Sequence, residues 1–407
     1  MSSTETQTQA EKLVKELNNQ TENLSIEIDV SKRVKGGFNA SHVDALPKLA
    51  REYLERHGVD LSNGYPEKPQ SEQIPLYVDD ALKIRNTPQE YIPRGKNADR
   101  EKKALFSKVK EVKHLTKYIG TELVGVQLAD LNEQELDELA LLIAERVVVF
   151  FRDQDLAPAR QLEIGQFFGN PEIHPNNFRV PGLPGTTVIW TQLFKRNGHK
   201  TSFKNARSAT GIWHSDLPHE LQPPGPTILA QNSLPSVGGD TAWSSGYAAY
   251  DKLSPAFQKF LEGKYAVQRS MHTYLDRNDP LNGGKQITRE QPIVRTHPVT
   301  GWKSLYVNRD WTVSIVGLEP EESRTILNYL FDVYEKNLDI QVRFRWQPTT
   351  PGTSTVAIWD NRVSQHTAVW DYDVEEDRHG VRVSALAEVP FFDPESKSQR
   401  EALGLDN

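Results

Sequence analysis

The sequence predicts a mostly β fold with flanking helices, arranged as a double-sheet jelly roll. The main observation is a series of short β-branched and aromatic runs in the second half of the chain, each bounded by turn residues. A second observation is that only a few helical patterns interrupt these runs, as expected when helices wrap a pair of facing sheets. The predicted strands cover residues 227–232, 265–270, 304–307, 342–346, 355–359 and 381–388.

Helical patterns lie mostly before these strands. Asn132 is placed to cap a helix whose apolar positions continue to residue 143. The stretch 123–131 has strand-like character, and 147–151 is a continuous β-branched and aromatic run of the kind found in a buried strand. Further helices are predicted over 158–168, over 254–263 and from residue 320 onward.

The chain divides into unequal segments. Residues 1–36 are polar and predict a mobile tail. Residues 37–112 predict a helical and extended N-terminal extension packed on the core, and 113–407 predict the jelly-roll domain. Within the extension, prolines punctuate 59–100 and indicate a loop-like segment on the surface of the domain. A helix is predicted within 41–57, with an apolar stripe formed by Leu46, Leu49, Ala50 and Leu54.

Composition excludes several classes of protein. The 407 residues are 37% hydrophobic, and no apolar run reaches the ~20 residues that a membrane-spanning helix needs. The formal net charge of −7, with both signs interspersed, argues against a general nucleic-acid binder. The absence of cysteine excludes disulfides, iron–sulfur clusters and thiolate-ligated zinc. The start of the sequence lacks the pattern of a signal peptide, so we expect a cytoplasmic protein without membrane partners.

A candidate metal motif occurs at His214-Ser-Asp216. On an extended strand these two side chains point to the same side, because side chains alternate with a period of two. With a third, distant histidine they would form the 2-His-1-carboxylate triad typical of non-haem Fe(II) oxygenases. His366 follows a strand-like run and is the favoured third ligand, although His219 and His379 compete for that role.

Two arginines predict an anion-binding site. Arg378 and Arg382 are four residues apart and therefore share one side of an extended chain. Guanidinium groups pair with carboxylates and other oxyanions, although pairing with the neighbouring acidic residues on a solvated edge is an equal alternative. Elsewhere, Gly238 and Gly239 predict a tight turn with positive φ, next to the hydroxyl of Thr241.

Taken together, these residues resemble the taurine dioxygenase branch of the Fe(II)/2-oxoglutarate-dependent oxygenases, and most of all the fungal sulfonate dioxygenases. The resemblance covers roughly residues 115–395. It implies a double-stranded β-helix (jelly roll) of the Fe(II)/2-oxoglutarate oxygenase type. The motifs that carry it, in order, lie at residues 213–216, 223–230, 234–243, 295–301, 346–348 and 357–366.

The resemblance implies a cofactor and a cosubstrate. His214, Asp216 and His366 match the metal ligands and would hold the catalytic Fe(II). Thr241 and Arg378 match the residues that bind the distal carboxylate of 2-oxoglutarate. The turn between residues 372 and 378 is one residue longer than in the bacterial enzymes, which leaves the register of the arginines open.

The resemblance also implies a substrate site. Arg382 matches the arginine that faces the substrate anion, and His174 matches the histidine that binds a sulfonate. Where the bacterial enzymes have a tyrosine three positions later, this chain has Asn177. This difference predicts that the amino end of taurine is bound by other contacts. Phe178 and Tyr306 are candidates for the pocket wall.

The implied activity is hydroxylation of alkylsulfonates such as taurine at the carbon next to sulfur, with release of sulfite and an aldehyde. Succinate and CO2 would be the co-products, and sulfur scavenging the physiological result. The alternatives are an oxygenase of the same fold acting on alkyl sulfate esters or another small organic anion, and a non-catalytic jelly-roll binding protein. The expected partners are the sulfonate, 2-oxoglutarate and O2, with a homo-oligomer as a further possibility and no nucleic acid.

Overall fold

The computed structural model describes residues 42–69, 74–174, 177–191, 193, 213–279, 281, 283–372 and 376–405. The polar tail expected at residues 1–36 lies outside the described residues. Within the described part of the chain, no helix is both long and apolar enough to cross a membrane.

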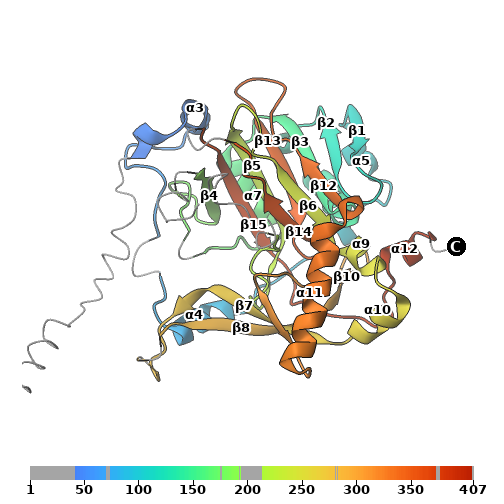
Figure 1. Cartoon of the computed structure of the whole chain (residues 1–407). Helices are drawn as coiled ribbons and strands as arrows, with labels where there is room; N and C mark the ends of the chain where they lie inside the picture. Colours follow the sequence, from blue (N-terminus) through green and yellow to red (C-terminus); the bar gives the residue numbers. More distant parts are fainter. Residues whose placement is uncertain are drawn as a thin grey trace, which may run out of the picture.

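A seven-stranded sheet forms the centre of the molecule (Figure 1). All its neighbouring strands are antiparallel except β2 and β3, which pair in parallel. The central strands β13, β5 and β15 are almost entirely buried, because both faces of the sheet are covered. In spatial order the strands are β1 (Glu111–His114), β2 (Thr121–Val124), β3 (Val148–Gln154), β13 (Ser354–Asp360), β5 (Pro224–Ser233), β15 (His379–Leu386) and β4 (Thr186–Trp190).

A smaller antiparallel sheet packs against the seven-stranded sheet. It consists of β12 (Gln341–Phe344), β6 (Thr241–Ser245) and β14 (Ser364–Ala368), with β6 in the middle. Aromatic rings fill the space between the two sheets: Phe150 of β3 stacks on Phe344 with ring centroids 3.8 Å apart and meets Trp243 edge-on at 5.2 Å. This arrangement of facing sheets is the one that the series of short strand-like runs predicts.

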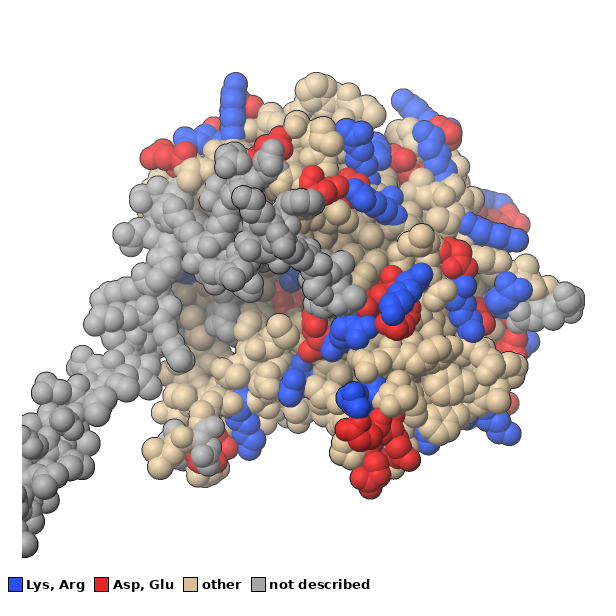
Figure 2. All heavy atoms as spheres, in the orientation of Figure 1, with Lys and Arg blue, Asp and Glu red and all other residues tan. Residues whose placement is uncertain are grey.

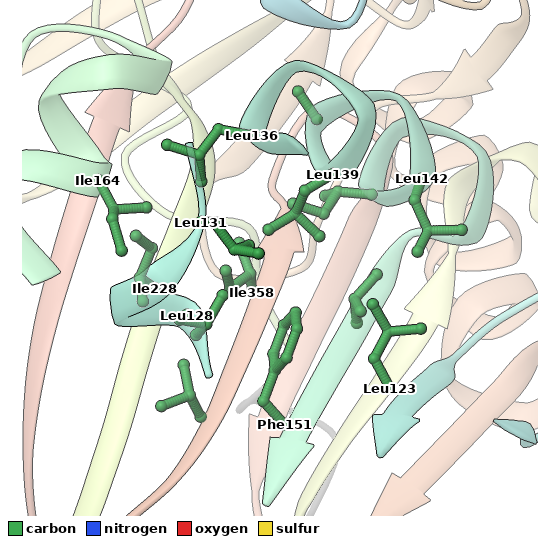
Figure 3. Packing of buried hydrophobic residues seen from close by; sticks show 14 of the residues in the cluster. Leu123, Leu128, Leu131, Leu136, Leu139, Leu142, Phe151, Ile164, Ile228 and Ile358 are labelled. Atoms are coloured by element: carbon green, nitrogen blue, oxygen red, sulfur yellow. The ribbon is translucent and has the colours of Figure 1, made fainter. Parts of the chain in front are cut away.

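Helices α6 (Glu133–Arg146) and α7 (Pro158–Phe168) cover one face of the seven-stranded sheet. Helix α6 begins at a capping box, in which Asn132 and Glu135 accept each other's backbone N–H groups. Figure 3 shows the apolar side chains of this helix directed onto the strands below. The cluster includes Leu136, Leu139, Leu142, Phe151, Ile228 and Ile358.

A second region lies beside the facing sheets (Figure 1). It contains the sheet β11-β7-β8 and the ribbon β10-β9. The apolar face of helix α11 packs into it through Leu327, Leu330 and Phe331. The strands are β7 (Tyr265–Tyr274), β8 (Lys285–Pro292), β9 (Val294–Thr296), β10 (Lys303–Leu305) and β11 (Thr312–Ile315), and the helical segments are α9 (Gly246–Asp251), α10 (Pro255–Leu261), α11 (Pro320–Lys336), η6 (Leu338–Ile340) and α12 (Gln399–Ala402).

The N-terminal segment contacts both regions. Helix α3 buries Ala50, Tyr53 and Leu54 against β4 and β15. The Tyr53 hydroxyl donates to the carbonyl of Leu156, and Tyr65 bonds to His379 at 2.7 Å. The helical elements of this segment are η1 (His42–Ala45), α3 (Lys48–Arg56), α4 (Val78–Arg85), η3 (Arg94–Lys96) and α5 (Lys103–Ser107).

The structure corrects three local expectations. Helix α4 falls within the predicted loop 59–100, and the predicted strand over 123–131 is β2 followed by the 3-10 helix η4 (Leu128–Asp130). Leu49, placed on the apolar stripe, is 46% exposed, because α3 starts only after Pro47 and turns Tyr53 inward instead. On the face shown in Figure 2, basic and acidic side chains intermingle, as the interspersed charges of the sequence predict.

Candidate metal centre and anion-binding site

The structure brings His214, Asp216 and His366 together. His366 lies on β14, and the backbones of His214 and His366 pair as an isolated antiparallel bridge, with N···O distances of 3.1 and 2.8 Å. One nitrogen of each histidine and one carboxylate oxygen lie within 4.8 Å of one another. Among the described residues, this is the group of three or more potential ligands that could hold a metal ion.

The protonation states of these groups suit a divalent metal. Burial and the neighbouring His214 imidazole lower the pKa of His366 to about 3, so its ring is neutral and its lone pair is available. Burial opposes ionisation of Asp216, but Arg382 and the two imidazoles hold its pKa below the ordinary value. His366 Nδ1 is buried without a hydrogen-bond partner within the described residues. Two imidazoles and one carboxylate are the donor set of an Fe(II) facial triad, and the residues therefore fit the metal that the sequence implies.

Asn361 supports the position of Asp216, and the sequence-based assignment did not single it out. Its Oδ1 accepts from the backbone N–H of Asp216 at 3.0 Å and from Trp359 Nε1 at 3.2 Å. Its Nδ2 donates to Thr227 Oγ1 at 2.8 Å. Asn361 lies in the last of the family motifs, which was the available signal, but its contact with Asp216 depends on the fold.

Thr241 and Arg378 meet in a buried hydrogen bond. The Arg378 Nη2 donates to Thr241 Oγ1 at 3.0 Å, and Trp346 Nε1 donates to the same hydroxyl at 3.0 Å. Arg378 is 5% exposed, and burial lowers the pKa of its guanidinium. Within the described residues, no carboxylate lies within ion-pair distance of it, so it is a buried cation suited to an incoming anion. The Gly238–Gly239 turn has the predicted positive φ values of 81° and 70°.

Arg382 lies on β15 and contacts one of the candidate metal ligands. Its Nη1 donates to both oxygens of Asp216, at 3.2 and 3.3 Å. Its Nε is buried and has no hydrogen-bond partner among the residues that are described. His174 is 6% exposed, and burial, with Arg85, His272 and Arg382 nearby, lowers its pKa well below the ordinary value. The imidazole of His174 is thus neutral at neutral pH.

The three remaining substrate candidates occupy different surroundings. Asn177 is half-buried, and its backbone N–H closes a turn onto the carbonyl of His174 at 3.2 Å. Phe178 packs on the apolar cluster that the N-terminal segment shares with β4. Tyr306 is buried with its ring beneath the guanidinium of Arg295, at 4.6 Å. Their roles at a pocket wall remain predictions.

The two competing histidines lie outside the metal group. His379 bonds through Nε2 to the Tyr65 hydroxyl and through Nδ1 to Asn232 Oδ1, both at 2.7 Å, so both ring nitrogens are engaged. His219 stacks on Trp311 and is 3% exposed, so it is buried apart from the three candidate ligands.

A buried charged cluster adjoins His174, and the sequence gave no signal for it. Arg85 Nη1 lies 3.0 Å from Glu220 Oε1 and 3.3 Å from Glu172 Oε1. Burial raises the pKa of Glu172 to about 7, even though Arg85 lowers it. His272 of β7 completes the cluster, with its ring centroid 4.7 Å from that of His174. These residues come from four distant segments, which no local pattern could connect.

Comparison with known proteins identifies the family. The model of the family "Taurine catabolism dioxygenase TauD, TfdA family" matches residues 111–384. An alpha-ketoglutarate-dependent sulfonate dioxygenase of Saccharomyces cerevisiae is 35% identical over 315 residues, which are 75% of this chain and 74% of that protein. An alpha-ketoglutarate-dependent dioxygenase of Penicillium expansum is 37% identical over 314 residues, 75% of this chain and 85% of that protein. An alkylsulfatase of Acinetobacter baylyi is 30% identical over 294 residues, 69% and 86% of the two chains.

Solved structures agree with this assignment. A taurine dioxygenase from Burkholderia xenovorans superposes with a TM-score of 0.57 at 31% identity, covering 70% of this chain and 94% of that one. The similarity confirms the jelly-roll fold that the sequence predicts, and it shows that the resemblance of the motifs reflects a shared family. The chain belongs to the taurine catabolism dioxygenase TauD, TfdA family and is an Fe(II)- and 2-oxoglutarate-dependent dioxygenase.

Proposed function

We propose that this dioxygenase hydroxylates alkylsulfonates at the carbon next to sulfur. The hydroxylated carbon then loses sulfite and becomes an aldehyde, while 2-oxoglutarate is converted to succinate and CO2. One atom of O2 goes to the substrate carbon and the other to succinate. The observation that carries the proposal is the position of Arg382, which contacts Asp216 of the metal group and whose charge helps to lower the pKa of the buried His174.

The proposed iron ligands are His214, Asp216 and His366. The backbone bridge between the two histidines and the Asn361 hydrogen bond to Asp216 hold these side chains on rigid elements. When bound, Fe(II) and 2-oxoglutarate supply the activation of O2 that hydroxylation of an unactivated C–H bond requires. The role of the protein is to keep Asp216 ionised and His366 neutral, and to leave coordination positions open.

The proposed cosubstrate site is the buried pair of Arg378 and Thr241. A guanidinium without a carboxylate partner among the described residues favours the entry of a dianion such as 2-oxoglutarate. The Thr241 hydroxyl accepts from both Arg378 and Trp346, so its own proton is free to bond a carboxylate oxygen. The site therefore offers both a charge and a directed hydroxyl donor.

The proposed substrate site holds the sulfonate between Arg382 and His174. Arg382 contributes the positive charge, and its unpartnered Nε can donate to an oxygen of the anion. The neutral His174 can donate one ring N–H. Binding an anion there directs its neighbouring carbon toward the metal group, which provides the positioning that the reaction needs. Asn177, Phe178 and Tyr306 are proposed to line this pocket, with Asn177 nearest to His174 along the chain.

Sulfite release tests the proposal. The enzyme, supplied with Fe(II), 2-oxoglutarate and O2, is assayed with taurine, isethionate, hexane-1-sulfonate and hexyl sulfate, and both sulfite and succinate are measured. Sulfite formed in equal amounts with substrate-dependent succinate is the expected result. Succinate formation that no sulfonate stimulates would refute the sulfonate assignment.

Alkyl sulfate esters are the second candidate. The similarity to the alkylsulfatase of Acinetobacter baylyi favours them, and a sulfate ester presents the same oxyanion to Arg382 and His174. Hydroxylation of such an ester next to oxygen releases sulfate rather than sulfite. Ion chromatography of the products therefore separates the two activities in one experiment.

Sulfur scavenging is the proposed physiological role. Sulfite can enter sulfur assimilation, whereas the sulfonate carbon–sulfur bond resists hydrolysis. A strain without this protein is expected to grow normally on sulfate and poorly when the preferred sulfonate is the sole sulfur source. Equal growth of the two strains on that sulfonate would contradict the role.

A further inference from the structure

Helix α4 and the β7–β8 hairpin lie together in Figure 1 and form a wall that faces the proposed substrate residues of the jelly roll. Val78 and Ala81 of α4 pack against Tyr274 of β7 and Ile287 of β8. The chain enters α4 through Tyr77, which forms a parallel bridge with Leu275. This helix precedes the residues matched by the family model, so part of the wall is additional to the matched region.

His272 is presented by this wall toward His174. Side chains alternate along β7, so that Ser270 and Tyr274 are buried while Met271 is 60% exposed. The His272 ring is half-buried, tilted by 50° to the His174 ring, with ring centroids 4.7 Å apart. Within the described residues, its ring nitrogens form no hydrogen bond, so both are available to a ligand.

Ion pairs attach the wall to the segment that carries His174. Arg85, at the end of α4, bonds Glu172, which precedes His174 by two residues, and it also pairs with Glu220. The side chains of all three residues are at most 10% exposed. Charged pairs at this depth hold a fixed geometry, because separating them would leave buried charges without a partner.

We propose that His272 is a specificity-determining residue that binds the substrate oxyanion together with His174 and Arg382. The proposal deepens the sulfonate function given above and rests on it. A tetrahedral oxyanion carries several oxygens pointing in different directions, more than one guanidinium can satisfy. His174 approaches from the jelly roll and His272 from the facing wall, so their N–H groups reach different oxygens. The pair thus selects tetrahedral oxyanions over planar carboxylates.

The test compares two substitutions of His272, one that removes the N–H donor and one that keeps an N–H donor. His272→Phe keeps the aromatic contact with His174 but cannot donate, whereas His272→Gln retains an N–H donor. A lost hydrogen bond to a charged group predicts a KM for the sulfonate about tenfold higher in His272→Phe. His272→Gln should fall within about threefold of wild type, and the KM for 2-oxoglutarate should not change in either variant.

Equilibrium binding provides a readout that is independent of turnover. Calorimetric titration of hexane-1-sulfonate into the anaerobic enzyme with Fe(II) and 2-oxoglutarate should show the same loss of affinity in His272→Phe. Acetate or hexanoate should bind equally weakly to all variants. A Kd and KM for the sulfonate within twofold of wild type in His272→Phe would overturn the proposal.

Two controls separate the possible causes of a change. Met271→Ala alters the exposed face of the same strand and should leave both constants unchanged. Thermal unfolding reports whether the hairpin still packs, and His272→Ala replaces His272→Phe if the larger ring disturbs it. The wild-type enzyme alone decides the proposed function: if it releases no sulfite from any sulfonate, that function fails, while the calorimetric comparison still decides whether His272 contacts the anion.

Discussion

At the scale of single residues, Asp216 is the group on which the candidate site depends. Its carboxylate lies 3.8 Å from His214 Nε2 and accepts from Arg382. Yet the local backbone is fixed by other bonds, namely the bridge between His214 and His366 and the donation from Asp216 N–H to Asn361. The Asp216 side chain can therefore be replaced without removing the hydrogen bonds that fix the local backbone.

Asp216→Ala should abolish Fe(II) binding and sulfite release while the protein still unfolds cooperatively. The loss follows because the remaining imidazoles form an incomplete ligand set. Iron content after anaerobic loading and a thermal denaturation curve check the two parts. Asp339→Ala, on the exposed partner of Lys252, serves as the control and should retain both iron and activity. Full iron binding by Asp216→Ala would show that the metal ligands are misassigned.

Glu172 makes stability depend on pH. Burial raises its pKa from 4.5 to about 7, so between these values the folded state binds the proton more tightly than the unfolded chain. The contribution of this group to the free energy of unfolding is therefore present at acidic pH and is lost as pH rises toward 7, by at most about 3 kcal/mol. Glu172→Gln removes this dependence.

Denaturant unfolding of wild type and Glu172→Gln between about pH 5 and 8 measures the effect. The variant should gain stability relative to wild type as the pH rises, because glutamine is never charged. A stability difference that stays constant over this range would mean that Glu172 titrates normally.

Residues within one motif were predictable from sequence, whereas contacts between distant segments were not. The spacing of His214 and Asp216 predicts a shared ligand direction, and the structure places His366 beside them. Arg382 lies on β15 and Arg378 directly precedes this strand, and both guanidinium groups are largely buried. In contrast, Arg85 and His272 approach His174 from separate elements, and each looks like an ordinary surface residue in the sequence. Their proposed roles at the substrate site depend on tertiary contacts that bring these residues next to His174.

At the scale of elements, the turn before β6 is sterically constrained. Gly238 has φ of 81°, and an added Cβ would lie 2.6 Å from the carbonyl oxygen of Asp371. Gly263 has a similar φ of 73°, but nothing lies within 4 Å of its added Cβ. The two glycines therefore differ in the room available for an added Cβ rather than in backbone conformation.

Gly238→Ala should destabilise the protein more than Gly263→Ala. Both substitutions incur the cost of a left-handed alanine, about 1–2 kcal/mol, and Gly238→Ala adds a steric cost of about 1–3 kcal/mol. Because the turn leads directly into Thr241, only Gly238→Ala should also raise the KM for 2-oxoglutarate. Chemical denaturation and steady-state kinetics check these outcomes. Equal destabilisation by the two variants would contradict the close approach of Asp371.

Helix α6 followed its sequence pattern, whereas the short helix α4 was not predicted. Helix α6 has a complete capping box and an apolar stripe, and it begins where Asn132 predicts. Helix α4 has eight residues, no side-chain cap and only Val78 and Ala81 buried, so its pattern is too short to recognise. It is helical because it packs on the hairpin, which is a tertiary effect that sequence periodicity does not record.

At the scale of the whole molecule, Arg85 joins the wall formed by α4 and the β7–β8 hairpin to the jelly roll. Arg85→Met leaves Glu172 and Glu220 buried without their cation and should destabilise the protein by about 3–5 kcal/mol. The KM for the sulfonate should rise while that for 2-oxoglutarate stays constant, because only the substrate wall is displaced. Combining Arg85→Met with Glu172→Gln and Glu220→Gln should restore most of the stability.

Arg277 offers a matched control for this prediction. It also connects the hairpin to α4, through Asp79 and Asp80, but it is exposed to solvent. Exposed ion pairs contribute little, so Arg277→Met should leave stability and both KM values nearly unchanged. If the two arginine variants behaved alike, the buried cluster would not be what holds the wall in place.

The position of α4 has a consequence for how such enzymes diversify. The proposed iron and cosubstrate residues all lie within residues 111–384, which the family model matches, whereas Arg85 lies before them. One support of the proposed substrate site is thus encoded before residue 111, whereas the residues proposed to contact the substrate lie in the same stretch as the iron and cosubstrate residues. Sequence changes in α4 would then reposition the supporting helix of the substrate site while leaving the proposed iron and cosubstrate residues unchanged.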